Sequence, residues 1–185
     1  MGELERRLPQ ARNRDIGFGS SANLTTVAIM RKLARTRAGL PLIREVALKI
    51  LERYRTKSHN YFDEARAIGE WVRDNVHYVK DPAGLEQITD PERLLRLALQ
   101  GRAHGDCDDQ ALLAATLLRS IGHTPKFKIV RYYAKTGPYN HIYVVDYAGN
   151  KEGERSRKRL VIDPIMKDKP IGYEVPHMDG REIPV

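Results

Sequence analysis

The feature that most constrains this chain is a helical segment with apolar side chains on nearly every face. It covers residues 108–121, and its apolar residues are Ala111, Leu112, Leu113, Ala114, Ala115, Leu117 and Leu118. A helix without a polar side cannot lie at the surface, so we expect this one to be buried at the centre of the fold. Gly122 follows it and is the expected stop of the helix.

The segments on either side of this helix differ in their periodicity. Before it, apolar residues recur at helical spacing over about 24–38, 42–54, 61–77 and 91–100. After it, the segments 126–133, 141–147 and 159–165 are rich in Val, Ile and Tyr and have turn-forming or charged residues at their ends. Helices first and an antiparallel sheet second predict an α+β fold with the buried helix packed on the sheet.

The positive charge is concentrated in the first third of the chain. The formal net charge is +8, and residues 1–60 hold 13 Lys and Arg against 5 Asp and Glu, whereas residues 61–185 hold 19 of each. We therefore expect three parts. These are a basic helical N-terminal extension (1–60), a globular core (61–165) and an extended, proline-containing C-terminal tail (166–185). The charge of the extension favours an acidic partner, either a protein surface or a nucleic acid.

Several classes of protein are disfavoured by the composition. The single cysteine excludes a disulfide framework and a zinc site built on paired cysteines. His104 lies three residues before Cys107, but no further ligands follow at metal-binding spacing, so we expect no metal and no cofactor. Neither a signal peptide nor a membrane span is evident, which predicts a cytoplasmic protein without a membrane partner.

The single cysteine lies at the start of the buried helix, in Gly105-Asp106-Cys107-Asp108-Asp109-Gln110. Asp106 is the expected helix cap, with Asp109 completing a capping box. The helix dipole favours the thiolate of Cys107, whereas the adjacent carboxylates oppose it, so a reactive thiol here needs an imidazolium nearby. A lone cysteine beside an apolar helix is otherwise more often a packing residue.

The strand segments supply the two partners that such a cysteine needs. His141 opens the second strand segment and Asp163 ends the third. If these strands are neighbours, Asp163 can orient His141, and Cys107 can reach the same end of the sheet. This is the nucleophile, base and orienting-group arrangement of thiol acyl-transfer enzymes. Taken separately, the two residues are also explained by a solvated strand edge and an Asp-Pro turn.

Other candidate residues have simpler explanations. His123 lies in a Gly-His-Thr-Pro turn and is expected to be exposed. The strand tyrosines are expected to pack on the sheet, although a groove for a peptide would use the same residues. These are Tyr132, Tyr133, Tyr139, Tyr143 and Tyr147.

Four stretches resemble a bacterial transglutaminase-like domain over about residues 60–165. They are Trp71-Val72-Arg73-Asp74-Asn75-Val76-His77-Tyr78, the stretch from Gly105 to Gly122, Asn140-His141-Ile142-Tyr143-Val144 and Val161-Ile162-Asp163-Pro164. The resemblance implies a papain-like α+β fold and a Cys-His-Asp triad that acts on amide or isopeptide bonds. The implied roles are Cys107 as nucleophile, His141 as general base and then acid, and Asp163 as the group that orients His141.

The chain also departs from the cross-linking members of that family. Asp108 follows the nucleophile where those enzymes carry an aromatic residue, and no tryptophan matches their oxyanion-hole residue. Gln100 and the backbone N–H of Cys107 are the candidate oxyanion donors. These departures favour hydrolysis, or a domain kept for its shape, over cross-linking.

Two functions follow from these observations. The first is a thiol-dependent hydrolase or acyl transferase that acts on peptide or isopeptide amide bonds. The second is a catalytically silent structural component of a virion or other assembly, which docks through residues 1–60. The short form with a basic extension is similar to proteins encoded in bacteriophage genomes, which places the expected protein in the host cytoplasm or in the virion.

Overall fold

The computed structural model describes residues 20–81, 87–132, 136, 138–148 and 158–185. Its helices are α1 (Ser20–Arg37), α2 (Pro41–Arg53), α3 (Tyr61–Asn75), α4 (Pro91–Leu99) and α5 (Cys107–Ser120). Its strands are β1 (Val76–Tyr78), β2 (Ala103–Gly105), β3 (Lys126–Arg131), β4 (His141–Ala148), β5 (Lys158–Ile162) and β6 (Asp179–Pro184). None of the helices within these residues is long and apolar enough to cross a membrane.

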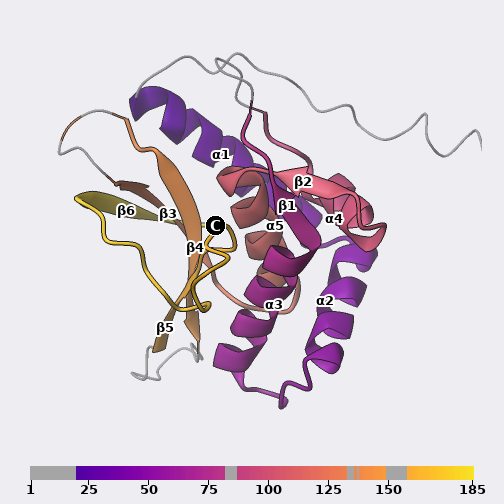
Figure 1. Ribbon diagram of the computed structural model, residues 1–185. Coiled ribbons are helices and arrows are strands. Elements are labelled where there is room, and N and C mark those ends of the chain that lie inside the picture. Colours follow the sequence, from indigo (N-terminus) through magenta and orange to yellow (C-terminus); the bar gives the residue numbers. More distant parts are fainter. Residues whose placement is uncertain (1–19, 82–86, 133–135, 137, 149–157) are drawn as a thin grey trace, which may run out of the picture.

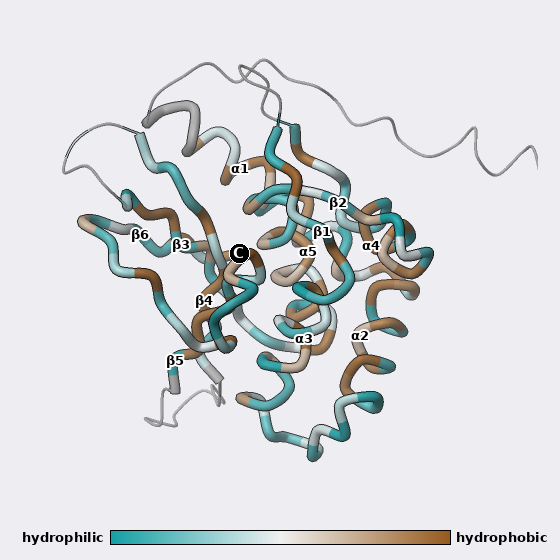
Figure 2. The backbone as a smooth tube through the Cα atoms, viewed as in Figure 1, coloured by the Kyte–Doolittle hydropathy of each residue, from teal (hydrophilic) through white to brown (hydrophobic). Residues whose placement is uncertain are grey.

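Helix α5 lies at the centre, with α2, α3 and α4 on one side and the larger sheet on the other, while α1 runs across the top of the view (Figure 1). It contacts all four remaining helices as well as β4, and its side chains from Ala111 to Leu118 are fully buried. The expectation of a buried central helix is confirmed. In Figure 2 the surrounding helices α2 and α4 alternate hydrophobic and hydrophilic segments, as amphipathic helices that cover a core do.

The larger sheet has the strand order β5-β4-β3-β6, and all of its pairs are antiparallel. Its two faces carry different residues, because successive side chains of a strand point to opposite sides. On β4, Ile142 and Val144 belong to the main core that contains α5, whereas Tyr143 and Val145 form a smaller cluster on the other face. The α+β class and the helix-on-sheet arrangement are those that the sequence predicts.

The last strand corrects one expectation. Residues 166–185 were expected as an extended tail, yet β6 pairs with β3 along its whole length, and Ile171 and Val185 are buried in the main core. The guanidinium of Arg119 on α5 also donates to the carbonyl of Val185 at 2.7 Å. A strand added here pairs the backbone groups of β3 that would otherwise form an open edge, so the segment is part of the sheet.

The N-terminal part also differs from the expected arm. Val27, Met30 and Ala34 of α1 are buried against the main core, and α1 contacts α5 directly. On α2 the buried residues are Ile43, Val46, Ala47 and Ile50. Each helix buries its apolar stripe and leaves its basic residues outside, so residues 20–60 pack as part of the core. Residues 1–19 of the expected extension lie outside the described residues.

Candidate active site

The cysteine lies at the first position of α5, where the sequence places it. The carboxylate of Asp106 caps the helix and accepts a hydrogen bond from the backbone N–H of Asp108 at 3.2 Å. Asp109 does not close a capping box, because its carboxylate accepts from the N–H of Thr89 at 2.7 Å and from its hydroxyl at 3.3 Å. Gly105 makes this possible, since a Cβ there would lie 2.6 Å from the Asp109 Oδ2 atom.

The histidine and the aspartate form a buried pair at one end of the sheet. The register of β4 with β5, in which Val144 faces Ile162, brings His141 and Asp163 to the same end of the two strands. The His141 Nε2 and Asp163 Oδ2 atoms are 2.7 Å apart, and each residue is 5% exposed. This hydrogen bond leaves Nδ1 as the ring nitrogen available to another group. Aromatic packing also holds the imidazole, since the ring of Tyr132 stacks on it at a centroid distance of 4.9 Å.

The thiol meets this end of the sheet. The backbone N–H of Ile142, the residue after His141, hydrogen-bonds the sulfur of Cys107, and the charge of Asp163 also acts on that sulfur. Helix α5 therefore brings its N-terminal thiol to the start of β4, where the His141–Asp163 pair lies. The structure thus places the sulfur of Cys107 against the backbone of the residue that follows His141 and within reach of the charge of Asp163.

The local charges determine the protonation of the thiol. Burial is the main cause that raises the pKa of Cys107 well above its ordinary value, and the carboxylates of Asp106 and Asp108 raise it further. The Ile142 N–H lowers the pKa by stabilising the thiolate, but it does not outweigh these effects. The thiol is therefore protonated at neutral pH in the absence of substrate, and a base must take its proton before the sulfur can attack.

Comparison with known proteins gives the family. A model of the transglutaminase-like superfamily matches residues 48–152, which is more than half of the chain. The chain belongs to the transglutaminase-like superfamily. The matched region includes Cys107 and His141, and it ends before Asp163. None of the curated protein sequences compared with the chain matches it.

Comparison with solved structures gives two matches of low sequence identity. The first is named "Putative Cysteine Protease", from Cytophaga hutchinsonii. It is 14% identical to this chain and has a TM-score of 0.46, and the alignment covers 75% of this chain and 42% of that one. The second is named "putative protease", from Parabacteroides distasonis. It is 15% identical with a TM-score of 0.50, and the alignment covers 85% of this chain and 32% of that one. This transglutaminase-like chain thus spans less than half the length of either protein.

One residue near the thiol escaped the sequence analysis. Tyr78 ends β1, which pairs in parallel with β2 so that Tyr78 lies opposite Gly105, two residues before Cys107. Tyr78 is 44% exposed, and its partial burial raises the pKa of its phenol, which the charges of Cys107, Asp106 and Asp108 raise further. The phenol is therefore a neutral O–H donor near the sulfur. Tyr78 ends one of the stretches that resemble the family, but nothing in the sequence pairs its strand with β2.

The proposed oxyanion donor Gln100 lies elsewhere. It is the exposed C-terminal cap of α4, and none of the contacts found among the described residues joins it to Cys107 or His141. Its position seven residues before the cysteine led to the suggestion, but Gln100 caps the end of α4, and β2 lies between it and Cys107 in the chain. Of the residues considered, Tyr78 is one whose phenol interacts with the charge of Cys107.

His104 and His123, the other two histidines considered from the sequence, both lie outside this site. His104 is exposed, with Nδ1 3.3 Å from the carbonyl of Arg102. His123 was expected at the surface but is buried, with 7% of its surface exposed. Its ring lies between the carboxylates of Asp146 and Glu64. The residues nearest to a metal-binding set within the described chain are Asp106, Asp108 and Asp109, whose oxygens lie within 4.8 Å of one another. Asp106 and Asp109 already accept backbone hydrogen bonds there, so these carboxylates serve the start of α5.

Proposed function

We propose that this chain is a thiol-dependent enzyme that hydrolyses peptide or isopeptide amide bonds through an acyl-enzyme on Cys107. The observation that carries the proposal is the buried His141–Asp163 pair beside a thiol at the N-terminus of α5. Cys, His and Asp are the groups that thiol acyl transfer requires, and here each has a position suited to one role.

In the first half-reaction, Nδ1 of His141 takes the thiol proton as the sulfur attacks the amide carbonyl. The Asp163 carboxylate stabilises the resulting imidazolium through Nε2. The oxyanion of the tetrahedral intermediate accepts from the backbone N–H of Cys107 and from the phenol of Tyr78. The intermediate collapses when the C–N bond breaks and His141 gives its proton to the leaving amine, which leaves a thioester on Cys107.

In the second half-reaction, His141 takes a proton from water as the water oxygen attacks the thioester carbonyl. The C–S bond breaks, the carboxylic acid leaves, and the proton on His141 returns to the sulfur. Because the thiol of the resting enzyme is protonated, transfer of this proton belongs to the attack itself. The rate of acylation then depends on proton transfer to His141 rather than on a thiolate that is already present.

The test is the pH dependence of alkylation of Cys107 by iodoacetamide, followed by intact mass. The wild type is compared with His141→Ala and Asp163→Asn. In a second measurement, the same three proteins react with p-nitrophenyl acetate, which forms an acetyl-enzyme on the nucleophile. We expect the wild type, quenched in acid within the first turnover, to carry an acetyl group on Cys107, and both variants to form this adduct far more slowly. Equal acetylation of all three proteins would contradict the proposal.

A second function is favoured by one observation, the high pKa of the Cys107 thiol. A thiol that stays protonated suits a domain that retains the transglutaminase-like fold as a structural part of a virion or other assembly. In that case the exposed basic residues of α1 and α2, such as Lys32, Arg35 and Lys49, supply the docking surface for a protein or a nucleic acid, and the chain is phage-encoded. Unchanged assembly of particles that carry Cys107→Ser would support this function, and loss of peptide cleavage by the same particles would support the enzyme.

A further inference from the structure

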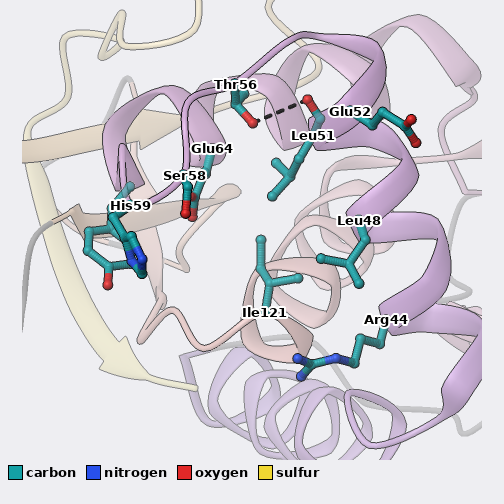
Figure 3. Close-up of a pocket in the computed structure, with 10 residues that line it drawn as sticks. Arg44, Leu48, Leu51, Glu52, Thr56, Ser58, His59, Glu64 and Ile121 are labelled. Carbon is teal, nitrogen blue, oxygen red and sulfur yellow. Dashed lines mark hydrogen bonds between the residues drawn. The ribbon is translucent and has the colours of Figure 1, made fainter.

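A cavity of about 540 Å³ lies at the end of α5 that is remote from Cys107 (Figure 3). Its walls come from α2, the turn that follows α2, the first turn of α3 and Ile121 after α5. Helix α5 has 14 residues, so at about 1.5 Å per residue its two ends are roughly 20 Å apart. The cavity is therefore distinct from the proposed active site.

The carboxylate of Glu64 lies at one end of this cavity and is hydrogen-bonded to the buried ring of His123. Glu64 lines the cavity and is 8% exposed, and its Oε2 atom lies 3.1 Å from Nε2 of His123. The Nδ1 atom of His123 lies 2.7 Å from Oδ2 of Asp146, which is itself buried. Since Oε2 is taken by His123, Oε1 is the oxygen of Glu64 that a ligand can reach.

The charge of this cluster is negative. Burial lowers the pKa of His123, but the hydrogen bonds and charges of Asp146 and Glu64 outweigh burial and raise it above its ordinary value. The cluster holds two carboxyl groups and one imidazole, so it has one more acidic group than basic group. A buried negative charge that faces a cavity attracts a cation that can donate hydrogen bonds.

The rest of the cavity sets the shape of that cation. In Figure 3 the side chains of Leu48, Leu51 and Ile121 lie between the Glu64 end and the Arg44 end. The guanidinium of Arg44 donates to the carbonyl of Ser120 at 3.0 Å, so it is already held at its own end of the cavity. A ligand that reaches Glu64 therefore places apolar atoms against the leucines, as the stem of an amine does.

We propose that this cavity binds an alkylammonium group, whose nitrogen donates to Glu64 and whose alkyl stem packs on Leu51 and Ile121. His123 and Asp146 are positioning residues that hold the carboxylate of Glu64 in place. The same chemistry can come from a small free amine or from the lysine side chain of a peptide. This proposal does not depend on the activity of Cys107.

The test uses butylammonium chloride as the probe and amide NMR spectra of the full chain at pH 7. We expect saturable shifts at Tyr61, Glu64 and Ile121 and none at Ile142, with no comparable shifts from butanol or butyrate. A neutral-capped Gly-Lys-Gly peptide then identifies the source of the ligand. Tighter binding of the peptide supports a lysine side chain, and binding of butylammonium alone supports a small amine. Equal shifts from all three butyl probes would overturn the proposal.

Variants make the test specific. Glu64→Gln keeps the shape of the side chain but removes its charge, and we expect butylammonium affinity to fall at least tenfold. Glu70→Gln on the same helix does not line this cavity and is the matched control, which keeps the wild-type affinity. Leu48→Arg covers the case in which Glu64→Gln does not fold, because Leu48 is 48% exposed on the cavity wall. It adds a competing cation, so it should abolish binding. Unchanged affinity in Leu48→Arg would overturn the proposal.

Discussion

Two buried clusters of histidine and carboxylate lie near opposite ends of α5, and they use the same groups differently. At the Cys107 end, His141 has one carboxylate partner, Asp163, and keeps Nδ1 for another group. At the Ile121 end, both ring nitrogens of His123 are engaged, one by Asp146 and the other by Glu64. A histidine can act as a base only through a nitrogen that is free to take a proton. This difference agrees with the proposed role of His141 as a base and leaves His123 with a structural role.

Replacement of His141 is the change with the largest expected effect. In His141→Ala, the thiol loses the base that takes its proton, and the rate of Cys107 acylation should fall by about 10³-fold or more. Stopped-flow acylation with p-nitrophenyl acetate measures this rate, and circular dichroism checks that the variant is folded. The matched change at the other end, His123→Gln, should leave the acylation rate of folded protein within about twofold of the wild type. An equal loss of rate in both variants would remove the distinction between the two clusters.

Replacement of His123 should instead lower the stability. His123→Ala leaves the carboxylates of Asp146 and Glu64 buried without their shared partner, which should cost about 3–5 kcal/mol of the free energy of unfolding. Urea denaturation measures this loss. His104→Ala, at an exposed histidine, is the control and should change the free energy of unfolding by less than about 0.5 kcal/mol. A loss no larger for His123→Ala than for His104→Ala would show that the buried cluster does not stabilise the fold.

The two clusters also differ in how well the sequence predicts them. The His141 end rests on local patterns, because the all-apolar helix after Cys107 has to be buried and the strand segments put His141 and Asp163 at strand ends. The His123 end has no such pattern, because Glu64 lies within a helix and Asp146 within a strand, and neither position marks it as a partner of His123. A Gly-His-Thr-Pro turn gives no sign of such partners, and so the expectation of an exposed His123 was wrong.

The same reasoning explains the other differences. The pairing of β6 with β3 and that of β1 with β2 join segments far apart in the chain, and no periodicity of a single segment reveals either. The tail was therefore expected to be extended, and Tyr78 was not recognised as a neighbour of Cys107. The charge excess of residues 1–60 suggested a separate extension, which is wrong for residues 20–60. A helix can be strongly basic on one face and still bury its other face in the core.

Removal of the Tyr78 hydroxyl is expected to have an intermediate effect at the His141 end. Tyr78→Phe keeps the ring but deletes the O–H that donates to the oxyanion, and acylation should slow by about 10²-fold. The same substitution at Tyr61, which packs edge-on against His123 at 5.6 Å, tests the other end and should leave the acylation rate unchanged. Steady-state hydrolysis by the two variants makes the comparison. If Tyr78→Phe retains the full rate, the oxyanion is stabilised by backbone N–H groups without the phenol.

The smallest expected effect is on the pH dependence of the free energy of unfolding, and it comes from Asp109, two residues after Cys107. Burial is the main cause that raises the pKa of Asp109 to about 7, against the hydrogen bonds from Thr89, which lower it. A carboxyl whose pKa is higher in the folded state than in the unfolded chain takes up a proton on folding. Its contribution to stability is therefore fully present below about pH 4, the ordinary pKa of aspartate, and is lost as the pH rises to about 7.

The variant Asp109→Asn tests this proton directly. The amide oxygen can still accept from the N–H of Thr89, but the side chain no longer titrates. The decline in the free energy of unfolding between pH 4.5 and 7 should therefore be shallower in Asp109→Asn than in the wild type, as measured by urea denaturation at several pH values. Asp74→Asn, at an exposed carboxylate on α3, is the control and should keep the wild-type slope. Parallel curves for the wild type and Asp109→Asn would mean that Asp109 is ionised in the folded protein across this range. An ionised Asp109 would add a negative charge near Cys107. That charge would disfavour the thiolate and make proton transfer from the thiol to His141 less favourable.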